Sequence, residues 1–289
     1  MPSIKTNLIY DVGMHLGQDT AYYLSLGYDV IAVDAFPEMI ENARRPFANE
    51  LKNGKLLLLN FAMTDKDNDV VNFHISEKTE WNSINQNIST RQNQKSKSIQ
   101  VPTVTLASLF QLYGVPYYCK IDVEGFDDIC IQTLRGLPEK PTFISCETEC
   151  FSENQIVSEN DILATLNSLA SIGYSKFKLI EQDFLSPLLP GKSFYLNNKK
   201  EPLLFRGIRR MVRPFNYQLK KMNFRELVSA KRGYQFPYGS TGPFGNNLDG
   251  LWMDYKTAKD TLLFHRNEFF SRKSETPIYT IWCDWHATI

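Results

Sequence analysis

The feature that most constrains the fold is a regular alternation of short apolar runs with helical stretches between Asn7 and about Gln182. Such alternation is typical of βαβ units around a parallel sheet that helices cover on both faces. In the first unit, residues 7–12 read as a strand, residues 18–26 as a helix, and Gly27 as the residue that ends the helix. We therefore predict an α/β fold with a mostly parallel sheet.

Acidic and glycine residues follow the first two predicted strands. Asp11, Gly13 and Gly17 lie where the first strand gives way to the helix, and Asp34 ends the second strand. Glycines let a ligand approach the backbone closely, and an acid at the end of the second strand suits the hydroxyls of a ribose. The third glycine of a dinucleotide fingerprint is missing, and an acid in this loop would repel a pyrophosphate. The layout favours a cationic nucleoside such as S-adenosylmethionine, although a tight turn in another α/β fold would use the same residues.

Four motifs resemble the FkbM family of S-adenosylmethionine-dependent methyltransferases. They are DVGMHLGQDT at 11–20, VDAFP at 33–37, NFAMTD at 60–65 and, most specifically, KIDVEG at 120–125. The resemblance covers about residues 7–149 and the closing stretch 282–287. It implies a class I methyltransferase fold, a Rossmann-like sheet of seven strands with one antiparallel, and O-methylation of a sugar or natural-product hydroxyl. Members usually carry Ala-Asn where this chain has Met14-His15.

Carried over by position, the resemblance assigns a cofactor site. Asp11, Gly13 and Gly17 would form the loop on the methionine side, and Asp34 would hold the ribose. The other residues expected beside S-adenosylmethionine are His15, Thr20, Ala35, Phe61, Ala62, Ser83 and Asp122. Phe61 and Ala62 would flank the adenine. For Ser83, an ordinary loop hydroxyl is an equally open interpretation.

Candidates for the chemistry follow the later strands. Asp122 and Glu124 lie two residues apart on an extended strand end and so project to the same side, near the expected position of the methyl group. Methyl transfer needs an aligned acceptor oxygen and can use a group that takes its proton. We expect this pair to serve as base or acceptor anchor, Lys120 to offset their charge, and Glu147 to be a further candidate. Capping of the next helix is the alternative.

The same carboxylates raise the question of a metal. Asp122, Glu124 and Glu147 offer the oxygen ligands that suit Mg²⁺. No ligand spacing requires an ion, and we predict no metal site.

The chain reads as a core interrupted by an insertion. The alternation stops at about Asp183 and returns in a last strand within 278–285. The expected parts are a methyltransferase core at 1–182, an inserted cap that selects the acceptor at 183–277, and a last core strand at 278–289. The cap holds eleven Lys or Arg between residues 199 and 232. Such a stretch could recognise phosphate on an acceptor or form a solvated face.

Composition narrows the function classes. Lys plus Arg equals Asp plus Glu at 32 each, so no whole-molecule field would gather nucleic acid. No apolar run approaches the roughly 20 residues that span a bilayer, and acids interrupt the N-terminal region where a signal core would lie. We expect a cytoplasmic protein without a transmembrane segment, with its five cysteines mostly reduced core thiols.

The predicted function is transfer of a methyl group from S-adenosylmethionine to a hydroxyl, with a sugar, glycan or glycosylated natural product as the favoured acceptor. Three alternatives remain. They are a nucleic-acid methyltransferase that uses the basic stretch, a nicotinamide dehydrogenase, and a non-catalytic nucleotide-binding module. Neutral net charge disfavours the first, and the glycine spacing disfavours the second.

Overall fold

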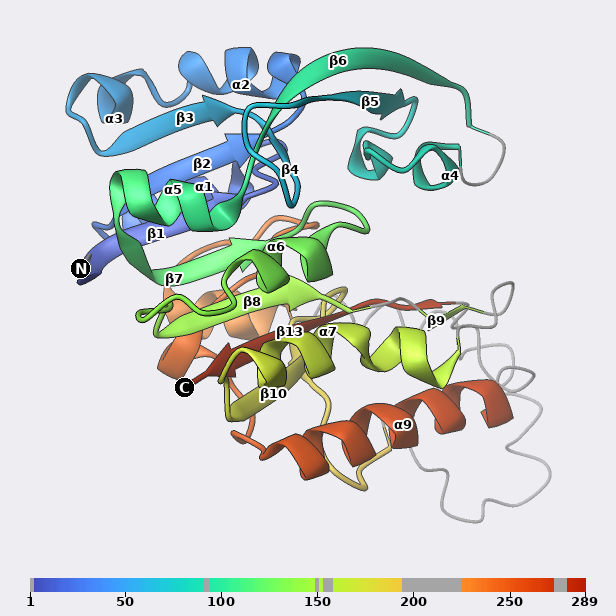
Figure 1. The fold of residues 1–289 in the computed structure, drawn as a ribbon. Coiled ribbons are helices and arrows are strands. Elements are labelled where there is room, and N and C mark those ends of the chain that lie inside the picture. Colours follow the sequence, from blue (N-terminus) through green and yellow to red (C-terminus); the bar gives the residue numbers. More distant parts are fainter. Residues whose placement is uncertain (1–2, 91–93, 149–150, 153–157, 194–224, 273–279) are drawn as a thin grey trace. The chain divides into compact units, whose positions relative to one another are not determined.

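The computed structural model describes residues 3–90, 94–148, 151–152, 158–193, 225–272 and 280–289 (Figure 1). The chain forms two compact units. Unit 1 consists of Met1–Glu147, Asn167–Tyr174 and Ala287–Ile289, and unit 2 consists of Thr148–Leu166 and Ser175–His286. The boundaries expected at residues 182 and 277 stay predictions from the sequence pattern.

Unit 1 is built on five parallel strands in the order β8-β7-β1-β2-β3. These are β1 (Ile4–Val12), β2 (Asp29–Asp34), β3 (Leu56–Asn60), β7 (Val115–Ile121) and β8 (Phe143–Glu147). Counted along this sheet, the order 3-2-1-4-5 is that of a doubly wound α/β protein. The expected α/β fold with a mostly parallel sheet is confirmed. In such folds ligands bind at the carboxyl ends of the strands where the order reverses, which here is between β1 and β7.

The helices of unit 1 follow the predicted alternation. They are α1 (Gln18–Ser25), α2 (Pro37–Arg44), α3 (Ala48–Lys52), α4 (Gln86–Ser89), α5 (Leu106–Tyr113) and α6 (Asp127–Thr133), with a 3₁₀ helix η1 (Thr79–Trp81). A small sheet of order β4-β6-β5 consists of β4 (Ala62–Met63), β5 (Val70–Ser76) and β6 (Ser96–Val104). Pro37 occupies the first turn of α2, where its fixed φ suits the helix and its missing N–H costs no hydrogen bond.

The core of unit 1 fixes the strand ends. The last five residues of β1 and all but one residue of β7 are buried, because helices cover a parallel sheet on both faces. Tyr10 in β1 packs edge-on against Phe110 of α5 and donates its hydroxyl to the carbonyl of Leu109 at 3.0 Å. This large side chain is therefore buried without an unsatisfied hydroxyl. The buried residues of β1 and β7 therefore fix the position of the residues that follow these two strands.

The remaining elements are α7 (Glu159–Ser171), β9 (Phe151–Ser152), β10 (Lys176–Glu181), β11 (Ser186–Pro187), η3 (Gly245–Asn247), α9 (Tyr255–Arg272), β12 (Thr280–Ile281) and β13 (Cys283–Thr288). Helix α9 lies in the segment 183–277, which the sequence pattern predicts as a cap without assigning helices to it. Its buried face carries the polar Thr261, His265 and Glu268 beside Ala258, Leu262 and Phe269, so the sequence shows no continuous apolar stripe. Strand β11, antiparallel to β10, was also unexpected.

The described residues bear on two expectations from composition, which concern membrane-spanning segments and the state of the cysteines. None of the helices in the described ranges is long and apolar enough to cross a membrane. Four cysteines are buried free thiols: Cys119, Cys130, Cys146 and Cys283. The fifth, Cys150, lies outside the described residues, as do eight of the eleven basic residues between 199 and 232.

Candidate active site

The loop between β1 and α1 requires glycine because other strand ends approach it closely. Gly13 has a left-handed φ of 79°, and a Cβ atom there would lie 1.7 Å from the carbonyl oxygen of Asp122. The N–H of Gly13 donates to the carbonyl of Val33 in β2 at 2.9 Å, and the N–H of Asp122 donates to the carbonyl of Val12 in β1 at 2.9 Å. The ends of three strands therefore meet around one residue without a side chain. Gly17 also has a left-handed φ, of 75°, and caps α1.

Asp34 at the end of β2 fixes this loop. Its Oδ2 accepts the backbone N–H of His15 at 2.8 Å, and its Oδ1 accepts the backbone N–H of Phe36 at 2.8 Å. Burial raises the pKa of Asp34 to about 6, although both N–H groups lower it. Each carboxylate oxygen keeps a second lone pair. The side chain can therefore still accept hydrogen bonds from the hydroxyls of a ribose.

His15 shows why this position tolerates few residue types. Its φ of 50° is left-handed, a region in which Asn, Asp and His are enriched among residues other than glycine. The histidine can therefore occupy the position where the FkbM proteins that the sequence resembles usually carry Asn. Its Nε2 lies 2.9 Å from Oγ1 of Thr79 in η1. Burial, helped by the charge of Lys120, lowers the pKa of His15, so the ring is neutral at neutral pH.

Lys120 is the centre of a buried charged cluster. Its Nζ lies 3.4 Å from Oδ1 of Asp11, 3.7 Å from Oδ2 of Asp19 and 3.3 Å from Oδ2 of Asp122. It also donates to the carbonyl of Gly13 at 3.1 Å. The Asp122 side chain is 30% exposed, against 0% for Asp11 and 4% for Asp19. Lys120 thus offsets the nearby acids, as expected, but its own side chain is enclosed among them.

Two residues of α1 complete the cluster. The hydroxyl of Thr20 donates to Oδ2 of Asp11 at 2.6 Å, so Thr20, expected beside the cofactor, supports the first acid of the loop. Asp19 beside Lys120 was not predicted as a site residue. An acid in the first turn of a helix is common for stability alone, and its position in the sequence therefore carried no distinct signal.

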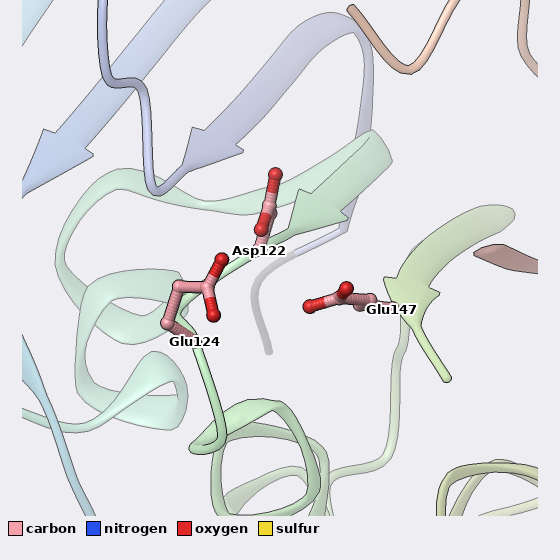
Figure 2. Close-up of side chains that lie close together, drawn as sticks. All are labelled: Asp122, Glu124 and Glu147. Atoms are coloured by element: carbon pink, nitrogen blue, oxygen red, sulfur yellow. The ribbon is translucent and has the colours of Figure 1, made fainter. Parts of the chain in front are cut away.

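Three carboxylates gather at the ends of β7 and β8. Asp122, Glu124 and Glu147 point toward one another, and a carboxylate oxygen of each lies within 4.8 Å of those of the other two (Figure 2). The structure thus brings together the acids that the sequence predicted for the chemistry. The predicted extended strand end is wrong, however, because β7 ends at Ile121 and Glu124 has a left-handed φ of 45°. Such a group can hold a metal ion, but partly exposed acids often gather without one. We assign no metal to it.

Two residues brace this group and were not predicted in that role. The hydroxyl of Ser83, expected beside the cofactor, donates to the backbone carbonyl of Glu124 at 2.7 Å. Asp127, in the first turn of α6, accepts the N–H of Val123 on Oδ2 and the N–H of Glu147 on Oδ1, both at 3.4 Å. Burial, reinforced by the charge of Asp122, raises the pKa of Asp127 to about 7.

Three further residues expected beside the cofactor, Ala35, Phe61 and Ala62, follow the ends of β2 and β3. Ala35 and Phe61 are partly exposed, whereas Ala62 is buried in β4. Asn60, which the sequence did not single out, donates its side-chain amide to the carbonyls of Asp34 and Ala35 at 2.9 and 3.1 Å. It thereby ties the two strand ends together.

This arrangement belongs to a known class of protein. The sequence model of the methyltransferase FkbM domain matches residues 11–175, which is more than half of the chain and includes every residue of the candidate site. The chain belongs to the FkbM methyltransferase family and is a methyltransferase. The members of this family depend on S-adenosylmethionine, so the cofactor expected from the sequence is that of its family. This family membership excludes two of the alternative functions, the nicotinamide dehydrogenase and the non-catalytic nucleotide-binding module.

Solved structures resemble the chain only distantly. A Thiobacillus denitrificans S-adenosylmethionine-dependent methyltransferase with S-adenosylhomocysteine is 12% identical, with 99% of this chain and 86% of that chain covered and a TM-score of 0.37. Haemonchus contortus phosphoethanolamine N-methyltransferase 2, also 12% identical, has 99% and 50% covered and a TM-score of 0.35. Precorrin-6y C5,15-methyltransferase from Geobacter metallireducens is 10% identical, with 62% and 70% covered and a TM-score of 0.32. Such TM-scores support no argument about activity. No curated protein matches the chain.

Proposed function

We propose that this protein transfers a methyl group from S-adenosylmethionine to a hydroxyl of a carbohydrate acceptor, with Asp122 as the group that accepts the hydroxyl proton. One observation carries the proposal. Of the three acids around Lys120, Asp122 has by far the most exposed side chain, and it follows β7 at the point where the strand order of the sheet reverses. Open α/β sheets bind their ligands at that point.

The charges of the site suit the cofactor. Three carboxylates, those of Asp11, Asp19 and Asp122, surround the single ammonium group of Lys120, which leaves an excess of negative charge. S-adenosylmethionine supplies an electrophilic methyl group on a cationic sulfur, and a negative surrounding favours that cation. Asp34 would accept the ribose hydroxyls with the lone pairs that its two backbone contacts leave free.

The acceptor class follows from the type of hydrogen-bonding group that the site offers. Ionised carboxylates are acceptors only, so Asp122, Glu124 and Glu147 suit a ligand with several hydroxyl donors, as a sugar has. Nearby carboxylates would repel the phosphates of a nucleic acid, which weakens the nucleic-acid alternative. Selection of the acceptor by residues 183–277 stays a prediction. Free buried thiols such as Cys119 fit the cytoplasmic location that belongs to this proposal.

The affinity for S-adenosylmethionine should depend on the ionisation of Asp34. Because the pKa of this carboxyl is about 6, lowering the pH through that value protonates one oxygen and removes an acceptor of ribose hydroxyls. We expect the affinity to fall by up to about tenfold per pH unit below pH 6. In Asp34→Ala the affinity at pH 7.5 should be lower by on the order of tenfold, and it should depend less on pH. Calorimetric titration from pH 5 to 8 measures both; an Asp34→Ala protein with the wild-type profile would contradict the assignment.

Asp122→Asn should lower turnover and leave the cofactor affinity nearly intact. The amide keeps the size of the side chain but cannot take a proton, so we expect a loss of about 10²- to 10⁴-fold. The assay is methyl transfer from labelled S-adenosylmethionine to a panel of monosaccharides and nucleotide sugars. Glu147→Gln is the matched control, since it removes a neighbouring charge but not the proposed base, and should cost much less. Unchanged turnover in Asp122→Asn would assign this residue to structure.

A further inference from the structure

Glu124 has a backbone conformation that glutamate rarely adopts. Its φ of 45° lies in the left-handed region, which costs a residue with a Cβ atom about 1–2 kcal/mol relative to the right-handed one. Glycine has no such cost, and the chain places one at the very next position, Gly125, with a φ of 88°. A strained residue persists only where its surroundings enforce the strain, and such residues cluster at functional sites.

Ser83 holds the carbonyl side of Glu124. Its hydroxyl donates to that carbonyl at 2.7 Å and accepts the N–H of Asn85 at 2.9 Å. The backbone of Ser83 is itself fixed, because it exchanges two hydrogen bonds with His74 of β5, at 2.8 and 3.1 Å. Ser83 is only 1% exposed. The donor that reaches Glu124 is therefore anchored to the small sheet.

Asp127 holds the other side of the same segment. It is 5% exposed, and its two carboxylate oxygens accept one N–H from Val123, which precedes Glu124, and one from Glu147. One buried side chain thus connects the backbone after β7 with the last residue of β8. The Glu124 and Glu147 carboxylates that meet in Figure 2 are carried by these two segments.

We propose that Ser83 and Asp127 are positioning residues that hold Glu124 in its left-handed conformation, so that its carboxylate anchors a hydroxyl of the acceptor beside Asp122. The inference rests on the proposed function for the role of the carboxylate. The strain at Glu124 and its two supports do not depend on that role. Ser83 contributes to methyl transfer through Glu124, in place of the cofactor contact that the sequence suggested.

The first test measures strain by thermal unfolding. Glu124→Gly relieves the left-handed strain, whereas the matched control Glu124→Gln removes the same charge and keeps the strained Cβ. After allowance for the greater freedom of glycine in the unfolded chain, Glu124→Gly should melt about 2 °C above Glu124→Gln. A Glu124→Gly protein that melts at or below Glu124→Gln would overturn the proposal.

The second test asks whether Ser83 acts through Glu124. In the wild-type background, Ser83→Ala should lower methyl transfer to the sugar panel by roughly tenfold, because a displaced carboxylate aligns the acceptor poorly. In the Glu124→Gly background the same substitution should cause almost no further loss, since effects of coupled residues are not additive. The affinity for S-adenosylmethionine should stay unchanged in every variant. Asp127→Asn is measured in the same way.

An equal loss from Ser83→Ala in both backgrounds would contradict the inference, as would a parallel loss of cofactor affinity. A wild-type protein that methylates no member of the panel would count against the proposed function instead. The melting comparison between Glu124→Gly and Glu124→Gln would then still decide whether Glu124 is held under strain.

Discussion

Replacing Lys120 by methionine should destabilise the protein by about 3–5 kcal/mol, because it leaves buried carboxylates without their cation. Asp11 is fully buried and Asp19 is 4% exposed, and the Lys120 ammonium lies within 4 Å of both. Methionine fills nearly the same space but supplies no charge and no donor for the carbonyl of Gly13. Guanidinium chloride unfolding at pH 7.5 measures the change.

Lys55→Met is the matched control for this substitution. Lys55 forms an ion pair with Asp29 at 2.6 Å, but the two side chains are 52% and 33% exposed. Exposed pairs contribute little, so this variant should lose less than about 1 kcal/mol. If Lys120→Met were no less stable than Lys55→Met, the buried charged cluster would not contribute to the fold as the structure indicates.

Gly13→Ala should be the most disruptive single methyl group that can be added to the loop after β1. The new Cβ atom would lie 1.7 Å from the carbonyl oxygen of Asp122, a distance that backbone atoms cannot accommodate without moving. We expect a loss of stability above about 4 kcal/mol, in the range reserved for severe defects, and no measurable binding of S-adenosylmethionine by whatever folded protein remains.

Gly27→Ala is the control for Gly13→Ala. It separates the steric clash at Gly13 from the cost of placing alanine in a left-handed backbone conformation. Gly27 has a φ of 90°, and nothing lies within 4 Å of the position of its Cβ atom. Alanine there should cost only the conformational penalty of about 1–2 kcal/mol and leave the cofactor affinity unchanged. Similar losses of stability in Gly13→Ala and Gly27→Ala would show that the close approach of Asp122 is not the reason why position 13 requires glycine.

Much of the fold and the centre of the site could be predicted from the sequence. Alternation of strands and helices indicated a parallel sheet, and in such a sheet the residues after each strand meet at one edge. Asp34 and Asp122 were therefore assigned to one site although they are distant in the sequence. The structure places the predicted carboxylates Asp122, Glu124 and Glu147 together.

The residues that the sequence missed act through tertiary contacts without a local pattern. Asp127 reads as an ordinary acid at a helix start, and only its burial and its contact with the N–H of Glu147 distinguish it. Ser83 was assigned to the cofactor by resemblance. The contact of its hydroxyl with the carbonyl of Glu124 has no signal in the sequence, because the pairing of Ser83 with His74 decides where this loop lies. The buried face of helix α9 includes the polar Thr261, His265 and Glu268, so no apolar periodicity marked it.

The most direct test of the account is an isothermal titration of the full chain with S-adenosylmethionine and, separately, with S-adenosylhomocysteine. Both compounds should bind at one site per chain. The negative charge around Lys120 should favour the cationic S-adenosylmethionine, so added salt should weaken its binding more than that of S-adenosylhomocysteine. Absence of binding by either compound to the folded protein would contradict the central claim that the loop after β1 and Asp34 form a cofactor site.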